Sequence, residues 1–289
     1  MKSLNEMSVL RSFLICALTV AIAGASSPAI AGQARAGRKH APVEVLRDVN
    51  GDPIRTSDGR LTSGNWSGYV VASYQTKEHY TAAQATWTVP TVTYDGFEAW
   101  SSSWIGIGGF CENKKCEPED ETLIQLGTEQ DAVSPSETDY YAWYEMLPYD
   151  SIPTSLVVNP GDVITASLSC AGACESPQSW TLSMTNETTS DSWSDVFSYE
   201  SPELSVEVIE EAPYSGVILP LADFDKATFS DTTADSAIVN FSKGDRIVME
   251  DRQSRHLYES SNVSGLVPTK NGFNACFSPK KALAKCPKP

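Results

Sequence analysis

From residue 63 onward, hydrophobic and polar positions alternate over short runs that are separated by turn residues. Alternation over four to eight residues predicts β-strands with one buried face. Apart from the N-terminal apolar run and the short basic C-terminal tail, no window sustains a helical period of 3.6 residues. Many short strands in about 230 residues predict a single antiparallel sandwich or barrel. The expected strands lie within residues 65–71, 85–90, 103–109, 121–127, 140–148, 156–164, 180–185, 205–213, 237–241 and 246–250, with a hairpin turn at 271–272.

The stretch 205–213, Ser-Val-Glu-Val-Ile-Glu-Glu-Ala-Pro, has an unusual pattern. As a strand it points successive side chains to opposite faces. Glu207 and Glu211 then share one face with Ile209, while Glu210 lies on the face of the valines. A solvated acidic edge is the simplest interpretation, and a pair of carboxylates in a functional site is the alternative.

The N-terminal 60 residues carry signals for export rather than for the fold. Basic residues precede an apolar run at 13–23 that is too short to span a bilayer, and an Ala29-Ile30-Ala31 cleavage pattern follows. We therefore expect a signal peptide over 1–31 and a secreted protein. Residues 32–60 form a basic segment that is either a propeptide masking an anionic cleft or a flexible tail, and the main domain is expected over 61–289.

Charge and cysteine usage narrow the possible functions. Residues 61–289 hold 13 basic and 32 acidic residues, which argues against nucleic acid and anionic membranes as partners. Six cysteines remain after removal of the signal peptide, in three close pairs that read as disulfides in an oxidising compartment. Their spacing and the scarcity of histidine argue against zinc, so we expect neither a metal nor a cofactor.

The chemistry-bearing residues are carboxylates, amides and aromatics. The nucleophile elbow, the zinc-protease motif, the P-loop and the dinucleotide fingerprint are all absent from the sequence. Tryptophans and tyrosines cluster between residues 66 and 144, and consecutive aromatics around Trp143 cannot all face one side of a strand. Some of them are expected to line a groove for an extended ligand.

A set of short motifs, in order and over residues 63–275, resembles the glutamic peptidases, the G1 or eqolisin family of acid proteases. The motifs are Asn65-Trp66-Ser67-Gly68, Trp87 to Pro90, Trp104 to Gly109, Leu123-Ile124-Gln125-Leu126-Gly127, Ala142-Trp143-Tyr144-Glu145, Asn159-Pro160-Gly161-Asp162 and Ser205 to Pro213. The resemblance implies a concanavalin-like β-sandwich of two large curved antiparallel sheets. The sequence departs from the family pattern at Gly108 and Tyr141, where some members carry aspartates, and at Val206 and Val208.

The resemblance implies a catalytic pair formed by Gln125 and Glu211. Glu211 is expected to act as general base and then acid on a water molecule, and the Gln125 amide to stabilise the oxyanion in acid, because it does not titrate there. The expected substrate-binding residues are Trp66, Trp104, Tyr144, Glu145 and Glu207. The partners would be protein or peptide substrates, with the enzyme a monomer.

Two other functions remain open at this point. The aromatic residues and carboxylates also suit a carbohydrate-binding sandwich or a glycosidase, in which Glu145 and Glu211 would face each other. The third is a sandwich module that has kept the fold without activity.

Overall fold

The computed structural model describes residues 38–250, 260–267, 271–279 and 283–289. The chain divides into two units, Met1–Ala34 and Arg35–Pro289, and every described residue belongs to the second. The expected signal peptide therefore lies outside the described residues, as does the start of the basic segment. The remainder of that segment, from residue 38, is described.

The second unit is built almost entirely from strands. Its described helical elements are one short helix, α2 (Ser73–Thr76), and one 3-10 turn, η1 (Phe241–Lys243). The strands are β1 (Leu61–Ser63), β2 (Trp66–Ala72), β3 (Ala82–Thr88), β4 (Ala99–Gly108), β5 (Leu123–Ser134), β6 (Glu137–Met146), β7 (Ile152–Pro153), β8 (Val163–Cys170), β9 (Ser179–Asn186), β10 (Asp191–Ser198), β11 (Ser205–Glu211), β12 (Lys226–Ala234), β13 (Ala237–Ile238), β14 (Asp245–Glu250), β15 (Ser260–Val263) and β16 (Phe273–Ser278).

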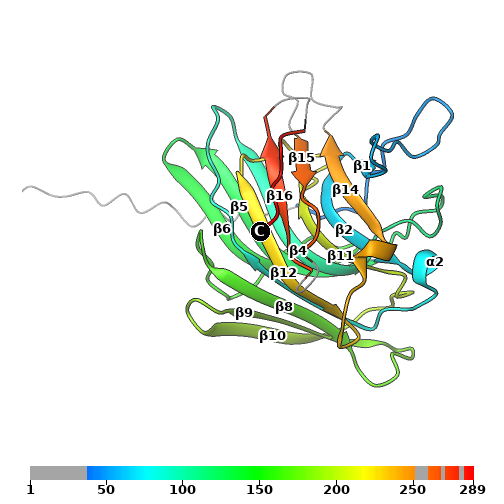
Figure 1. Cartoon of the computed structure of the whole chain (residues 1–289). Coiled ribbons are helices and arrows are strands. Elements are labelled where there is room, and N and C mark those ends of the chain that lie inside the picture. The colour runs from blue at the N-terminus through cyan, green and yellow to red at the C-terminus, as the bar shows by residue number, and fades with distance from the viewer. Residues whose placement is uncertain (1–37, 251–259, 268–270, 280–282) are drawn as a thin grey trace, which may run out of the picture. The chain divides into compact units, whose positions relative to one another are not determined.

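These strands form one continuous sheet (Figure 1), in which fourteen follow the order β10-β9-β8-β3-β12-β16-β15-β14-β2-β11-β4-β5-β6-β7, while β1 pairs with β14 and β13 with β12. Every pairing between described strands is antiparallel except that of β1 with β14. The sheet folds over, so that the half made of β10, β9, β8, β3 and β12 faces the half made of β2, β11, β4, β5 and β6. The indole of Trp87 on β3 donates to the Thr128 hydroxyl on β5 at 2.9 Å across this interior. The expected β-sandwich is therefore confirmed.

Two hydrophobic clusters lie on opposite faces of the β2-β11-β4-β5-β6 half. The larger fills the space between the two halves and includes Val206 and Val208 of β11. The smaller lies on the other face and combines Trp104 and Ile209 with Val43 of the basic segment. Residues from 38 onward thus cover one face of the sheet, and that cover decides the geometry of the site.

Several expected strands differ from the structure. Residues 156–158 are irregular, and the strand of this region begins only at Val163, after the turn at Gly161. Residues 237–241 form the two-residue β13 and the start of η1. Strands β1, β7, β10, β12, β15 and β16 lie outside the expected ranges. In β10 and β12, polar residues interrupt the apolar positions and weaken the period-two signal.

The three expected cysteine pairs are disulfide-bonded: Cys111–Cys116, Cys170–Cys174 and Cys276–Cys286. Each closes a short local loop.

Candidate active site

Strand β11 lies between β2 and β4, and all seven of its residues are buried. Its alternation is the one that the sequence predicts. Glu207 and Glu211 share the face of Ile209, and Glu210 points into the interior, where the Ser103 hydroxyl donates to its carboxyl group. The interpretation of this stretch as a solvated edge is wrong, because no residue of β11 is exposed.

Glu211 is surrounded by hydrogen-bond donors. The Trp104 indole N–H donates to Oε2 at 2.8 Å, and the Asn65 amide donates to Oε1 at 3.4 Å. Burial is the largest influence on the Glu211 carboxyl and holds its pKa well above the usual range. The negative charge of Glu145 acts in the same direction, while the Trp104 hydrogen bond opposes both. Glu211 is thus a buried carboxyl group whose hydrogen-bond donors stabilise the ionised form, although burial disfavours that form.

Gln125 lies on β5, beside Glu145 on β6 and opposite Gly106 on β4. A Cβ at position 106 would lie 3.1 Å from the Cβ of Gln125 and 3.0 Å from the Trp104 ring, so glycine leaves the room that these two side chains occupy. The Gln125 amide donates to the carbonyl oxygen of His40 at 2.7 Å and to Glu145 Oε2 at 3.2 Å.

Glu129 and Asp131 follow Gln125 at intervals of two on β5 and therefore share its face. Both are fully buried. Arg38 donates to Glu129 Oε1 at 2.8 Å and to Asp131 Oδ2 at 2.7 Å. Burial raises the pKa of each carboxyl, and the Arg38 charge opposes the rise. Neither residue is among the expected site residues, although the period of two from Gln125 points to both.

His40 sits deeper in the same face. Its ring stacks on Trp143, with 3.5 Å between centroids and 3° between planes. Nδ1 lies 3.0 Å from Glu145 Oε2, and Nε2 lies 2.9 Å from Glu129 Oε2. Burial lowers the pKa of the imidazole, and its hydrogen bond to the Glu145 carboxylate opposes that shift. Each ring nitrogen of His40 thus lies within hydrogen-bond distance of a buried carboxyl group.

The peptide group between His40 and Ala41 lies between the two expected catalytic side chains. Its carbonyl oxygen accepts from Gln125, and the Ala41 N–H lies close enough to the Glu211 carboxyl to lower the pKa of that group slightly. The Trp66 indole then donates to the Ala41 carbonyl at 3.0 Å. Gln125 and Glu211 are thus brought to one peptide bond, from strands that are 86 residues apart in the sequence.

The five expected substrate-binding residues differ in their positions. Trp66, Trp104 and Glu145 contact the covering segment or the two catalytic candidates directly. Glu207 is on the same face, and neither of its carboxyl oxygens has a hydrogen-bond partner of normal geometry among the described residues. Burial raises its pKa well above the usual range, and the Ser205 hydroxyl opposes this rise. Tyr144 is not brought into the site.

Tyr144 lies on the opposite face of β6 from Glu145, since neighbours in a strand alternate. It is half-buried and stacks on Phe197 and Trp193 of β10, with centroids 4.5 and 5.3 Å apart. It closes the edge of the sandwich, and this position gives no support to a substrate contact.

The positions that depart from the resembled family have local explanations. Gly108 has φ +99°, and a Cβ there would meet the Thr122 carbonyl oxygen at 2.4 Å. The Asp120 carboxyl lies 3.1 Å from that same point, so an acid from another segment occupies the space. The Tyr141 hydroxyl accepts a hydrogen bond from Arg38 at 2.9 Å.

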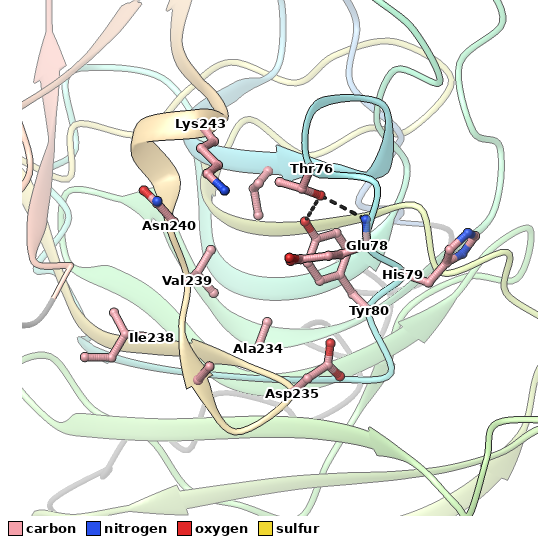
Figure 2. A pocket seen from close by; sticks show the side chains of 12 residues that line it. Thr76, Glu78, His79, Tyr80, Ala234, Asp235, Ile238, Val239, Asn240 and Lys243 are labelled. Carbon is pink, nitrogen blue, oxygen red and sulfur yellow. Dashed lines mark hydrogen bonds between the residues drawn. The ribbon is translucent and has the colours of Figure 1, made fainter.

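A separate hollow of about 460 Å³ lies away from these residues (Figure 2). Figure 2 shows Asn240 and Lys243 on one wall and His79 and Tyr80 on the other. Among the residues that the structure describes, none of the expected site residues lines it.

The described ranges hold no group of three or more His, Cys, Asp or Glu side chains that could bind a metal ion. Within the same ranges, no helix is long and apolar enough to cross a membrane.

Comparisons with known proteins give the family. The model of the Peptidase A4 family matches residues 64–267. The chain belongs to the Peptidase A4 family. The resemblance to the G1 glutamic peptidases is thereby confirmed, and the protein is a peptide hydrolase.

Two solved structures show the same fold. A crystal structure of scytalido-glutamic peptidase with a transition state analog inhibitor has a TM-score of 0.55 and 22% identity, covering 74% of this chain and 98% of that one. The structure of SCP-B, an eqolisin peptidase in a complex with the tripeptide Ala-Ile-His, has a TM-score of 0.53 and 20% identity, with the same coverage. Comparison with curated proteins finds no match.

Proposed function

We propose that this peptidase is a secreted acid endopeptidase in which Glu211 and Gln125 act together on one peptide bond. The observation that carries the proposal is the His40–Ala41 peptide group, whose oxygen is bound by Gln125 while its N–H faces Glu211. A scissile bond needs an oxyanion donor on its oxygen and a proton donor at its nitrogen, and this arrangement offers one of each.

The proposed reaction uses one proton twice. The Glu211 carboxylate takes a proton from water, and the resulting hydroxide attacks the carbonyl carbon. The negative charge that develops on the oxygen is held by the Gln125 amide, a donor that stays neutral in acid. Protonated Glu211 then gives the proton to the leaving nitrogen, the C–N bond breaks, and the products are a carboxylic acid and an amine.

The surroundings of Glu211 fit work in acid. The base must be ionised to act, and the usual pKa of a glutamate is about 4.3. The hydrogen bond from Trp104 favours the ionised form, and removal of the covering segment would admit water and reduce the burial that raises the pKa. Activity is then expected to rise with pH through the pKa of the uncovered Glu211.

We further propose that residues 32–60 are a propeptide and that the described chain is a zymogen. Arg38 and His40 fill the face that holds Gln125 and Glu211, and both catalytic candidates are completely buried beneath them. Peptide substrates need that face to be open. The N-terminal signal-peptide pattern and the three disulfides support export, and a monomer is proposed.

The alternative functions lose their main support. The aromatic rings of this face contact a peptide chain in the structure: Trp66 donates to the Ala41 carbonyl and Trp143 stacks on His40, while Trp104 donates to Glu211. The family assignment also favours peptide hydrolysis over glycan binding.

The test compares two neighbouring carboxyl groups. Denatured protein is incubated with the full chain and with the Glu211→Gln and Glu210→Gln variants at pH 2–5. We expect hydrolysis by the wild type and by Glu210→Gln, since Glu210 points into the interior, and none by Glu211→Gln. Hydrolysis by the Glu211→Gln variant at the rate of the wild type would refute the assignment.

A further inference from the structure

The segment 38–42 is held as an extended peptide. Each of its five carbonyl oxygens accepts a hydrogen bond from a different residue of the domain. The donors, in chain order, are Ser151 (3.2 Å from its backbone N) to Arg38, Tyr214 (2.8 Å) to Lys39, Gln125 (2.7 Å) to His40, Trp66 (3.0 Å) to Ala41 and Asn65 (3.0 Å) to Pro42. The Lys39 N–H also donates to the Tyr214 carbonyl at 2.9 Å, which completes a strand-like bridge. The Lys39–Tyr214 bridge resembles peptide binding by strand addition, while the side chains of Gln125, Trp66 and Asn65 hold the next three carbonyl oxygens.

The register of this segment singles out one bond. Among the peptide groups of residues 38–42, the structure gives contacts to both Gln125 and Glu211 only for the group joining His40 to Ala41. The side chains of residues 38–40 therefore indicate which side chains the site accepts in the part of a substrate that precedes the cleaved bond.

Arg38 and His40 point to the same side, as residues two apart in an extended chain do. Glu129 contacts both, with Oε1 on the Arg38 guanidinium and Oε2 on the His40 ring. Asp131 adds a second carboxyl to Arg38, and the Trp100 ring lies 5.7 Å from its guanidinium carbon. Lys39, between them, is about one-third exposed and reaches only the Pro148 carbonyl and Asp150 near the surface.

The buried carboxyls give this pocket its selectivity. Glu129, Asp131 and Glu145 are completely or almost completely buried and are matched by the Arg38 and His40 side chains. A substrate with an apolar side chain in place of arginine would leave Asp131 Oδ2 without the partner it has here, and one with an apolar side chain in place of histidine would do the same to Glu129 Oε2. Removing one partner of a buried, hydrogen-bonded charge pair weakens binding at least about tenfold.

We propose that the site selects peptides with an imidazole side chain directly before the cleaved bond and arginine two positions earlier, and that His40–Ala41 is the bond it cleaves in its own chain. This inference rests on the proposed function, because it takes Gln125 and Glu211 as the groups that mark the cleaved bond.

The first experiment follows the full chain during incubation at a series of pH values from 3 to 8, because the covering segment raises the pKa of Glu211, with N-termini identified by mass spectrometry. A new terminus at Ala41 is expected in the wild type. The same terminus is expected to be absent in Glu211→Gln, which keeps the shape of the side chain. The inference would be overturned if the enzyme degrades added protein while the His40–Ala41 bond of its own chain stays intact.

The second experiment measures kcat/KM of the full chain, after incubation, on a capped peptide with the sequence of residues 38–44, Arg-Lys-His-Ala-Pro-Val-Glu. Replacing Arg by Ala or His by Leu should each lower kcat/KM at least about tenfold, since the first change removes the partner of Asp131 Oδ2 and the second that of Glu129 Oε2. Replacing Lys by Ala is the matched control and should change it less than about threefold, because that side chain reaches only the surface.

A variant of the enzyme tests the same pocket from the other side. The double change Glu129→Gln and Asp131→Asn keeps the shapes and removes the charges. The preference for arginine over alanine should shrink to less than about threefold, because neither remaining group is a carboxylate. Cleavage of the alanine peptide, which contains no arginine, shows that the variant is folded and active.

The outcomes separate the two proposals. If neither denatured protein nor any peptide is cleaved by a Glu211-dependent activity, the proposed function fails. If protein is cleaved in a Glu211-dependent way but the peptides show no preference for arginine and histidine, the function stands and the inference of specificity is refuted.

Discussion

Replacing Glu210 by glutamine should reduce the loss of folding stability as the pH rises. Glu210 is completely buried in the interior, and burial raises its pKa to about 8, against hydrogen bonds from Ser103 and Ser101. A glutamate in the unfolded chain has a pKa near 4.5. The folded pKa is the higher of the two, so the contribution of Glu210 to stability is complete below pH 4.5 and is lost as the pH rises towards 8.

The magnitude follows from this difference. Each pH unit between the two pKa values costs about 1.4 kcal/mol of unfolding free energy, so the loss between pH 5 and pH 7 is about 3 kcal/mol. Glutamine has almost the same shape, still accepts from Ser103 and never ionises. For a domain of this size, about 3 kcal/mol corresponds to a Tm difference of about 5–10 °C.

The assay is thermal unfolding of the wild type and of Glu210→Gln at pH 5, 6 and 7. The Tm of the variant relative to the wild type should rise by about 5–10 °C over this range. Glu187→Gln, in the exposed turn after β9, is the control and should track the wild type. A Tm difference for Glu210→Gln that is the same at all three pH values would refute the reasoning.

Two further changes test the neighbourhood of the site. Trp104→Phe removes the indole donor to Glu211, so the pKa of that carboxyl should rise and the acid limb of the pH–rate profile should move up by about one pH unit; a downward shift would contradict this role. Tyr144→Ala should lower the unfolding free energy by about 1–3 kcal/mol through lost stacking on Trp193 and Phe197, with kcat/KM on peptides within about threefold of the wild type. A large fall in kcat/KM for Tyr144→Ala without loss of Tm would instead indicate a substrate contact.

Local periodicity was enough to predict part of the site. The period of two placed Glu211 on the face opposite Glu210, and the structure has the same arrangement on β11. The same rule, applied to β6, excludes Tyr144 and Glu145 from sharing a face, and applied to β5 it adds Glu129 and Asp131 to the face of Gln125. These differences follow from information that the sequence contains.

Other features depend on contacts between distant parts of the chain. His40 lies 85 residues from Gln125 and 105 residues from Glu145 in the sequence, and no local pattern indicates that it stacks on Trp143. The sheet order is another example. Strands β14, β15 and β16, from the C-terminal part of the chain, lie between β12 and β2, so they join the two halves of the sheet. Strand pairing over such separations is decided by the packing of the whole domain.

The most direct test of the central claim is the turnover of Gln125→Ala on one fixed peptide, compared with Gln130→Ala. Gln130 is also buried on β5, but it faces the interior and bonds to Thr128, so it controls for the loss of a buried amide. If Gln125 holds the oxygen of the cleaved bond, its loss should lower kcat by about 10²–10³, while Gln130→Ala stays close to the wild type. Equal kcat values for Gln125→Ala and the wild type would contradict the claim.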